Sequence, residues 1–297
     1  MNTPPASLGA ATPADSTEVE RLARELAQVR AEFQDFVHTV SHDLRAPLRH
    51  IHAFSKILEE DLSNPPPEIL AHLHTIRHAA QLLTQQLDGL TALSRLGQQP
   101  LNLQAVPLGP LARSVVDELA QRHPARQVQW QVAEDLPLVL ADADLLRKLL
   151  THLLDNALKF SRKRELTQVT LSWQAVSPQV AVRTAGATQA GQGEVPIAVL
   201  GSDQVEGQTG GVRQCQISIT DNGVGFAPAQ AYKLFKVFAR LHPARDYDGL
   251  GLGLVSCRKI VARLGGCIDI TAQPDAGCCV TVTLPMAAED SPRTCCA

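Results

Sequence analysis

Residues 33–51 read FQDFVHTVSHDLRAPLRHI, and the spacing of their apolar side chains decides the architecture of the N-terminal part of the chain. Phe33, Phe36 and Val40 continue a series that begins at Val19 and advances by alternating steps of three and four residues. A repeat of about 3.5 residues keeps one apolar seam along a helix and is typical of a left-handed coiled coil. The spacing therefore predicts a long helix whose apolar seam needs a partner.

A second helix with the same repeat follows a break in the pattern. Asn64 and the prolines 65–67 end the first helix, because proline lacks an amide hydrogen, and they can begin the next one. Apolar residues then return with heptad spacing from Ile69 to Leu90. Two such helical hairpins would bury their seams as a dimeric four-helix bundle.

The limits of this helical domain follow from local signals. Thr17 and Glu20 form a capping-box pattern, so the first helix is expected to begin at Thr17. Residues 1–16 are small, polar and proline-containing, and are expected to form a disordered leader. Gly97 to Pro100 breaks the helical pattern, which places the dimerisation domain at 17–97.

Residues 98–286 are predicted to form a second domain of a different class. An amphipathic helix is expected over 142–161, with Asp142 or Asp144 near its cap. Alternating patterns predict strands at 214–220, 266–271 and 278–284. The mixture indicates an α/β sandwich and makes the whole chain an α+β multidomain protein. The aperiodic stretch 174–213 is expected to be a mobile insertion, and 287–297 a disordered tail.

The composition indicates a globular protein without a broad charged surface. The chain has 297 residues, of which 44% are hydrophobic, enough to build cores for two domains. A formal net charge of −3 provides no basic field for nucleic acid. The sequence shows neither an apolar stretch of membrane-spanning length nor a signal peptide, so we expect a cytoplasmic protein. The seven cysteines include no Cys-x-x-Cys pair and are expected to be reduced thiols.

Four short motifs follow one another along the chain. They are Ser41-His42-Asp43-Leu44-Arg45-Ala46-Pro47, Asp155-Asn156-Ala157-Leu158-Lys159-Phe160, Asp221-Asn222-Gly223-Val224-Gly225 and Gly249-Leu250-Gly251-Leu252-Gly253-Leu254. This ordered set resembles the sensor histidine kinase family of two-component systems over residues 33–285, and its phosphoacceptor stretch is most like that of phytochrome-type kinases. The resemblance implies a phosphoacceptor and dimerisation domain, an ATP-binding domain of the GHKL superfamily, and ATP and Mg²⁺ as cofactors.

The third motif would recognise the base of the nucleotide. The resemblance makes Asp221 the residue that accepts a hydrogen bond from the adenine amino group. Gly223 and Gly225 would let the backbone turn closely against the base. In isolation the same residues would be an ordinary Asp-Asn-Gly turn, and only the company of the other motifs favours a binding role.

The second and fourth motifs would hold the phosphates. Asn156 offers an oxygen ligand to Mg²⁺, and Lys159, one turn along the predicted helix, can neutralise phosphate charge. The alternative is a pair of solvent-facing side chains. A helix expected near Val255 would present free amides to the phosphates. The glycines that lead into it, which could also form a purely structural turn, are Gly249, Gly251 and Gly253.

The segment between the two glycine motifs resembles the lid that covers ATP in this family. It comprises Phe235, Phe238 and residues 239–248. Two phenylalanines at helical spacing are otherwise more often part of a core.

His42 is the expected phosphoacceptor. One of its ring nitrogens would attack the γ-phosphorus while Asp43 holds or takes the proton of the other. Pro47 should bend the helix, because its ring clashes with the carbonyl of Asp43. Arg45 could face phosphate or solvent. His38 lies one turn before His42, a spacing that could hold a metal, but no third ligand has a matching position.

Two other functions compete with the kinase. GHKL ATPases that drive conformational clamps place a glutamate four residues before the magnesium asparagine, and here that residue is His152. Histidine kinases more often have asparagine there, so His152 also puts the magnesium geometry in doubt. A binding module without a competent phosphoacceptor is disfavoured by the intact His42 and Asp43. The expected partners are a second copy of the chain, a response regulator receiver domain and a separate sensor protein, with no nucleic acid.

Overall fold

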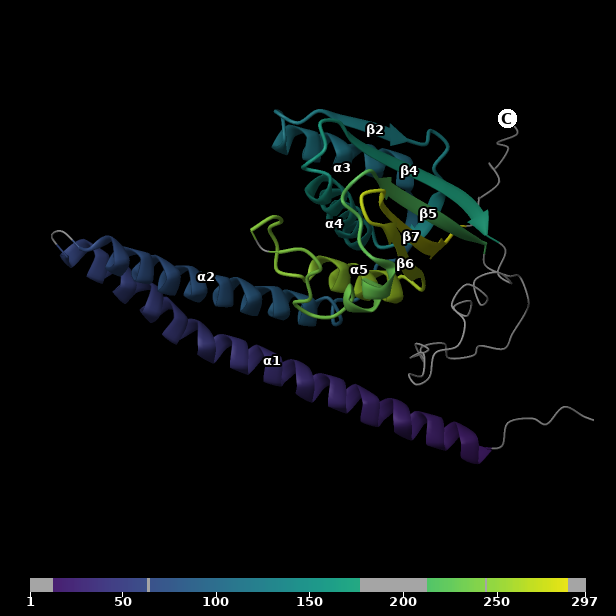
Figure 1. Ribbon diagram of the computed structural model, residues 1–297. Helices are drawn as coiled ribbons and strands as arrows, with labels where there is room; N and C mark the ends of the chain where they lie inside the picture. Colours follow the sequence, from purple (N-terminus) through teal and green to yellow (C-terminus); the bar gives the residue numbers. More distant parts are fainter. Residues whose placement is uncertain (1–12, 63–64, 177–212, 244, 288–297) are drawn as a thin grey trace, which may run out of the picture. The chain divides into compact units, whose positions relative to one another are not determined.

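The computed structural model describes residues 13–62, 65–176, 213–243 and 245–287, with side chains from Arg21 onward. The chain divides into two compact units, Met1–Arg95 and Leu96–Ala297. Figure 1 shows a helical unit and a unit with a sheet. The division falls close to the break that the sequence predicted at Gly97.

The first unit is a hairpin of two long helices. Helix α1 spans Pro13–Asp61 and helix α2 spans Pro67–Arg95, and they contact each other. The predicted start at Thr17 is wrong, because α1 is already helical at Pro13. Proline suits the first turn of a helix, where its missing amide hydrogen would have no partner. The expected disordered leader is therefore helical from Pro13, and its residues 1–12 lie outside the described residues.

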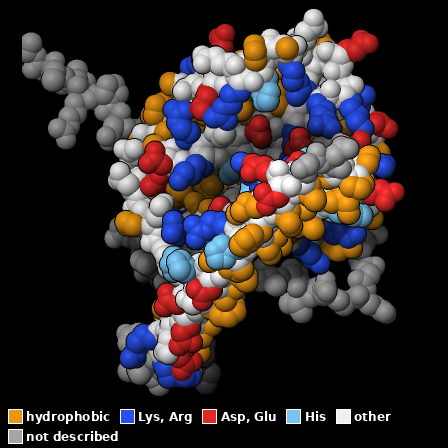
Figure 2. All heavy atoms as spheres, turned by 90° about the vertical axis from the view of Figure 1, so that its left-hand side faces the viewer, with side chains coloured by type: hydrophobic (Ala, Val, Ile, Leu, Met, Phe, Trp, Pro, Cys, Tyr) orange, Lys and Arg blue, Asp and Glu red, His pale blue; other side chains and the backbone are white. Residues whose placement is uncertain are grey.

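The hairpin buries some of its apolar side chains and exposes others. Val37, Leu48, Leu73 and Ala80 are buried. Other large apolar side chains of the predicted seams are exposed in the single chain, and Figure 2 shows hydrophobic side chains on the surface of this unit. The hairpin thus has the shape of half a four-helix bundle, and the bundle itself stays a prediction.

The second unit contains two sheets. In the smaller sheet β1 (Gln104–Pro107) pairs antiparallel with β3 (Leu138–Ala141). The larger sheet has the strand order β2-β4-β5-β7-β6, in which β2 and β4 are parallel and the other neighbours are antiparallel. Its strands are β2 Val128–Val132, β4 Thr167–Val176, β5 Gln214–Asp221, β6 Cys267–Gln273 and β7 Gly277–Pro285.

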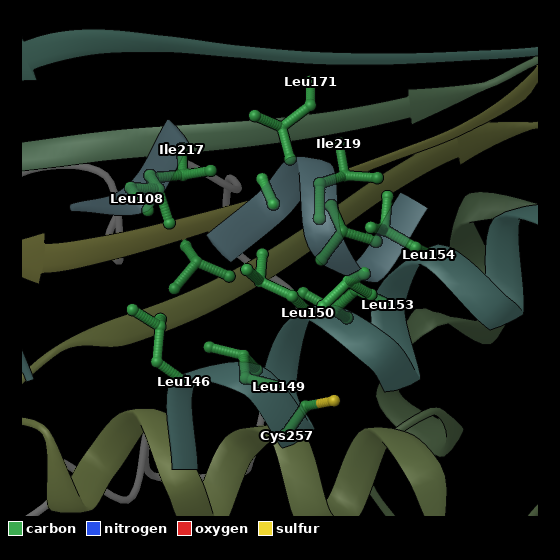
Figure 3. Packing of buried hydrophobic residues seen from close by; sticks show 14 of the residues in the cluster. Leu108, Leu146, Leu149, Leu150, Leu153, Leu154, Leu171, Ile217, Ile219 and Cys257 are labelled. Atoms are coloured by element: carbon green, nitrogen blue, oxygen red, sulfur yellow. The ribbon is translucent and has the colours of Figure 1, made fainter. Parts of the chain in front are cut away.

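Three helices cover one face of the larger sheet, as Figure 1 shows. They are α3 Leu108–Arg122, α4 Ala143–Phe160 and α5 Gly253–Arg263. In Figure 3 the leucines of α4 fill the space between the strands and α5. Burial of this leucine stripe fixes α4 in rotation about its axis and places its polar residues on the opposite face.

The helix and strands that the sequence predicts correctly are those with a clear hydrophobic period. The helix expected over 142–161 is α4, and the strands expected from 214, 266 and 278 are β5, β6 and β7. The insertion expected at 174–213 begins too early, because residues 174–176 belong to β4 and pair with β5. Residues 177–212, and 288–297 of the expected tail, lie outside the described residues.

Among the helices of the described residues, none combines the length and the apolar character that crossing a bilayer requires.

Candidate functional site

His42 and Asp43 lie next to each other on the solvent side of α1. The His42 Nδ1 atom is 3.1 Å from Asp43 Oδ1, and the two side chains are 75% and 71% exposed. Ser41, the preceding residue, is buried. The hydrogen bond lets Asp43 hold the tautomer with hydrogen on Nδ1, which leaves the Nε2 lone pair free to act as a nucleophile.

Arg45 does not point to the phosphoacceptor as a free cation. Its Nε donates to Asp88 Oδ1 of α2 at 3.0 Å. Arg45 therefore links the two helices of the hairpin one turn after His42. Pro47 lies inside α1, which remains helical on both sides of it, so the bend expected there stays a prediction.

The metal pair of His38 and His42 has no further support. Among the residues described, no group of three or more His, Cys, Asp or Glu side chains is placed to hold a metal ion.

Helix α4 positions the asparagine and lysine of the second motif. Its N-cap is Asp142, whose side chain accepts from the amides of Asp144 and Leu145, so Asp142 and not Asp144 is the cap. Asn156 and Lys159 are half-buried on its polar face. Burial lowers the pKa of Lys159, and Arg240 lowers it further, against the opposing charges of Asp155 and Asp248.

The fourth motif lies against this face of α4. A methyl group added at Gly249 would be 3.2 Å from Lys159 Nζ, and one at Gly253 would be 3.8 Å from Asn156 Nδ2. Gly253 is the first residue of α5, which begins two residues before the Val255 expected. The amides of the first turn of α5 therefore open beside Asn156 and Lys159, where a phosphate would be stabilised by both.

Gly251 shows why this loop must be glycine-rich. Its φ is 73°, and a Cβ there would lie 2.6 Å from the carbonyl oxygen of Ala239. A side chain would clash with the backbone of Phe238 and Ala239.

Asp221 is the last residue of β5 and is buried. The residue is 8% exposed, and its Oδ1 accepts from the Gly223 amide at 2.8 Å. Burial raises the pKa of Asp221 to about 6, although the amides of Gly223 and Cys278 oppose the shift. A buried carboxylate with acceptor capacity to spare is suited to an amino group of a ligand.

The turn after Asp221 packs backbone against backbone. A Cβ at Gly225, whose φ is 56°, would be 1.9 Å from the Gln273 carbonyl oxygen, and one at Gly223 would be 2.8 Å from that of Phe160. The Val224 amide donates to the Phe160 carbonyl at 3.1 Å. Because Phe160 directly follows Lys159, this contact brings the third motif to the end of α4 that carries the phosphate-binding candidates.

An aromatic cluster holds the expected lid segment to α4, and sequence reasoning did not single it out. The rings of Phe160, His242 and Tyr247 lie 5.2 to 5.6 Å apart, and Tyr247 is buried. Arg162 lies 4.9 Å from the Tyr247 ring centre, and His242 Nε2 is 3.1 Å from the Gly225 carbonyl. The one signal in the sequence is a lone tyrosine within a polar stretch.

The two phenylalanines expected in the lid behave differently. Phe235 packs against the core and under the Arg258 guanidinium, which lies 5.2 Å from its ring centre. Phe238 is exposed and has a φ of 61°, which is uncommon for a bulky residue.

His152 lies one turn before Asn156 on α4 and is exposed. Partial loss of hydration of the imidazole lowers its pKa, Asp155 opposes this shift, and Lys148 and Lys159 add to it. The neutral imidazole is therefore favoured at pH 7, and the position carries no carboxylate.

Comparison with known proteins gives the same domain order. The His Kinase A (phospho-acceptor) domain profile matches residues 34–99, and the profile of the histidine kinase-, DNA gyrase B- and HSP90-like ATPase matches residues 141–288. Together they cover more than two thirds of the chain.

Individual relatives agree with the profiles. The methanogenesis regulatory histidine kinase FilI of Methanothrix harundinacea is 28% identical over 90% of this chain and 26% of its own length. Cyanobacterial phytochrome B of Nostoc is 26% identical over 90% of this chain and 31% of its own length. The chain thus spans between a quarter and a third of these relatives.

A solved structure supports the fold. Full-length ShkA in complex with AMPPNP has a TM-score of 0.52 and 23% identity, over 85% of this chain and 46% of that one. The ordered motifs and the two matched domains lead to one conclusion. The chain belongs to the two-component sensor histidine kinase family.

Proposed function

We propose that this protein phosphorylates its own His42 from ATP and passes the phosphoryl group to an aspartate of a response regulator receiver domain. The observation that carries the proposal is the exposed His42 and Asp43 pair, with Nδ1 and Oδ1 3.1 Å apart. A histidine held in this tautomer is prepared for nucleophilic attack.

The chemistry follows from the two ring nitrogens. Nε2 of His42 forms a bond to the γ-phosphorus while the bond from that phosphorus to the β,γ-bridging oxygen breaks. ADP leaves with the electron pair of the broken bond. Asp43 takes the Nδ1 proton as positive charge develops on the ring, so the phosphorylated imidazole ends neutral.

The residues beside the phosphates fit Mg²⁺ with ATP. The half-buried Asn156 has a side-chain amide oxygen, and Mg²⁺ prefers hard oxygen ligands. Bound Mg²⁺ would neutralise charge on the β- and γ-phosphates. Lys159 and the amides at the start of α5, which lie beside Asn156, would hold and orient the triphosphate. Asp221, Gly223 and Gly225 form the base end of the proposed site, with Gly249, Gly251 and Gly253 at the phosphate end.

Net ATP hydrolysis is a weaker reading of the same domain. A clamp ATPase needs a base that activates water beside the triphosphate. His152 occupies the place of that base, and its imidazole is exposed to solvent and not directed by a carboxylate hydrogen bond among those described.

The proposal extends to partners and location. Dimerisation would cover the exposed seams of α1 and α2, and a response regulator would receive the phosphoryl group. We infer a separate sensor protein as the source of the signal, a cytoplasmic location because the reaction consumes ATP, and no role for nucleic acid because the net charge is −3.

The test is labelling with γ-³²P-ATP and Mg²⁺. The wild type should acquire label that is lost in acid and retained in base, as expected of a phosphoramidate. His42→Gln should remove the label and keep ATP binding, whereas His38→Gln, one turn earlier, is the matched control and should keep both. Asn156→Ala should fold normally and lose magnesium-dependent labelling. Acid-stable label, or full labelling of His42→Gln, would refute the assignment.

A further inference from the structure

Arg164 lies outside all four motifs, in the segment between α4 and β4, and its guanidinium binds two backbone carbonyls of the third motif. Its Nε donates to the Asn222 carbonyl at 2.8 Å, and its Nη2 donates to the Gly223 carbonyl at 3.1 Å. Nη2 also donates to the Asp275 carbonyl at 2.6 Å. The half-buried guanidinium therefore joins the turn after β5 to the turn between β6 and β7.

The side chain of Asn222, in the same turn, binds back to the backbone that follows Arg164. Its Oδ1 accepts from the Gln168 amide at 3.0 Å, and its Nδ2 donates to the Leu166 carbonyl at 2.9 Å. The segment that carries Arg164 and the turn that follows Asp221 are thus bound to each other by both partners. A rigid planar guanidinium is suited to holding several carbonyls in one arrangement.

The held backbone leads directly to the Asp221 carboxylate. Gly223 gives its carbonyl to Arg164 and its amide to Asp221 Oδ1, at 3.1 and 2.8 Å. The turn between β6 and β7 approaches the same place, since the Asp275 amide donates to the Val224 carbonyl at 2.8 Å. Movement of Gly223 would therefore change the direction in which Asp221 presents its free oxygen.

We propose that Arg164 is a positioning residue for base recognition, which acts through Gly223 on the Asp221 carboxylate. The inference rests on the proposed function, because it assigns the base of ATP to Asp221. A small error in the placement of a hydrogen-bonding group weakens the recognition that depends on its direction. The hydrogen bonds of Arg164 go to Asn222, Gly223 and Asp275, whereas the phosphate end is formed by α4 and the start of α5.

The test compares ligands that do and do not carry the base. Binding of ATP, GTP and inorganic tripolyphosphate, each with Mg²⁺, would be measured by calorimetry on the full chain. Arg164→Gln should weaken ATP binding by about tenfold, the order expected from losing hydrogen bonds of a charged donor. Tripolyphosphate should bind as it does to the wild type, and the preference for ATP over GTP should fall by the same factor. Arg164→Lys, which keeps the charge but not the fork, should lie between the two.

Arg122→Gln is the matched control, because Arg122 is an exposed arginine of the same unit that pairs with Glu118 on α3. It should leave all three affinities unchanged. Unchanged ATP affinity in Arg164→Gln, or equal losses for ATP and tripolyphosphate, would overturn the inference. A wild type that binds none of the three ligands would instead overturn the proposed function.

Discussion

At the scale of single residues, the burial of Asp221 lowers the free energy of unfolding once its carboxyl group is ionised. Its pKa is raised to about 6 from 3.8 because burial disfavours the charged form. Between these values the native state holds a proton that the unfolded chain releases. The free energy of unfolding therefore falls as the pH rises from about 4 to about 6, and the loss persists above pH 6.

We expect Asp221→Asn to remove most of this loss. The amide keeps an oxygen for the Gly223 N–H and carries no charge. Relative to the wild type, the free energy of unfolding of the variant should rise by roughly 2 kcal/mol between pH 4 and pH 7. Tryptophan fluorescence in urea can follow the unfolding of this unit alone, because both tryptophans of the chain, Trp130 on β2 and Trp173 on β4, lie in it. The same variant should lose ATP binding, and a pH-independent difference in stability would contradict the burial argument.

At the scale of an element, Asp142 at the start of α4 has a lowered pKa, the opposite of the shift at Asp221. Burial alone would raise its pKa, but the amides of Asn102, Leu145 and Asp144, with the charge of Arg263, lower it below 3.8. Its carboxylate caps α4 and also accepts from Asn102 at 3.1 Å. The stabilisation is present above the unfolded pKa and is lost as the pH falls through the lower folded value.

We expect Asp142→Ala to lower the free energy of unfolding by about 1 to 2 kcal/mol at pH 7, and by less at pH 3. Asp144→Ala is the matched control, since Asp144 is an exposed residue of the same first turn and does not provide the cap. Tryptophan fluorescence in urea gives both values. Equal losses in the two variants would mean that the dipole of the helix, and not the cap, accounts for the effect.

The elements differ in how far their sequence determines them. Helix α4 could be predicted because its leucines repeat over the whole helix and Asp142 marks its start. Strands β1 and β3 are four residues each, too short to show a period, and they are stabilised by pairing with each other. Helix α3 was likewise not predicted, although it supplies fully buried leucines to the core.

The same distinction holds within the candidate site. The motif residues could be identified because their types and order are unusual along the chain. Arg164 and Tyr247 could not, because their roles depend on contacts with residues far away in sequence, such as Asp275 and Phe160. Local patterns carry no record of such contacts, which are set only when the sheet and the helices pack.

At the scale of the whole molecule, the hairpin of α1 and α2 leaves apolar side chains in water. Ile51 of α1 and Leu83 of α2 are 45% and 48% exposed. Leu83 belongs to the heptad series of α2, and Ile51 follows the point after Val40 where the spacing in α1 shifts. An apolar stripe of this kind on a soluble protein marks a surface for association. A second copy of the hairpin presents the same stripe, so a symmetric dimer would bury both.

We therefore expect the full chain to be a dimer at micromolar concentration, as sedimentation equilibrium can show. Leu83→Glu should shift it towards the monomer, because two buried carboxylates would face each other across the symmetric interface. Gln81→Glu adds the same charge at an exposed position nearby on α2 and should remain dimeric. Tryptophan fluorescence should be unchanged in both variants, since both tryptophans lie in the other unit. A wild type that sediments as a monomer, or a Leu83→Glu variant that remains fully dimeric, would show that these seams are not the interface.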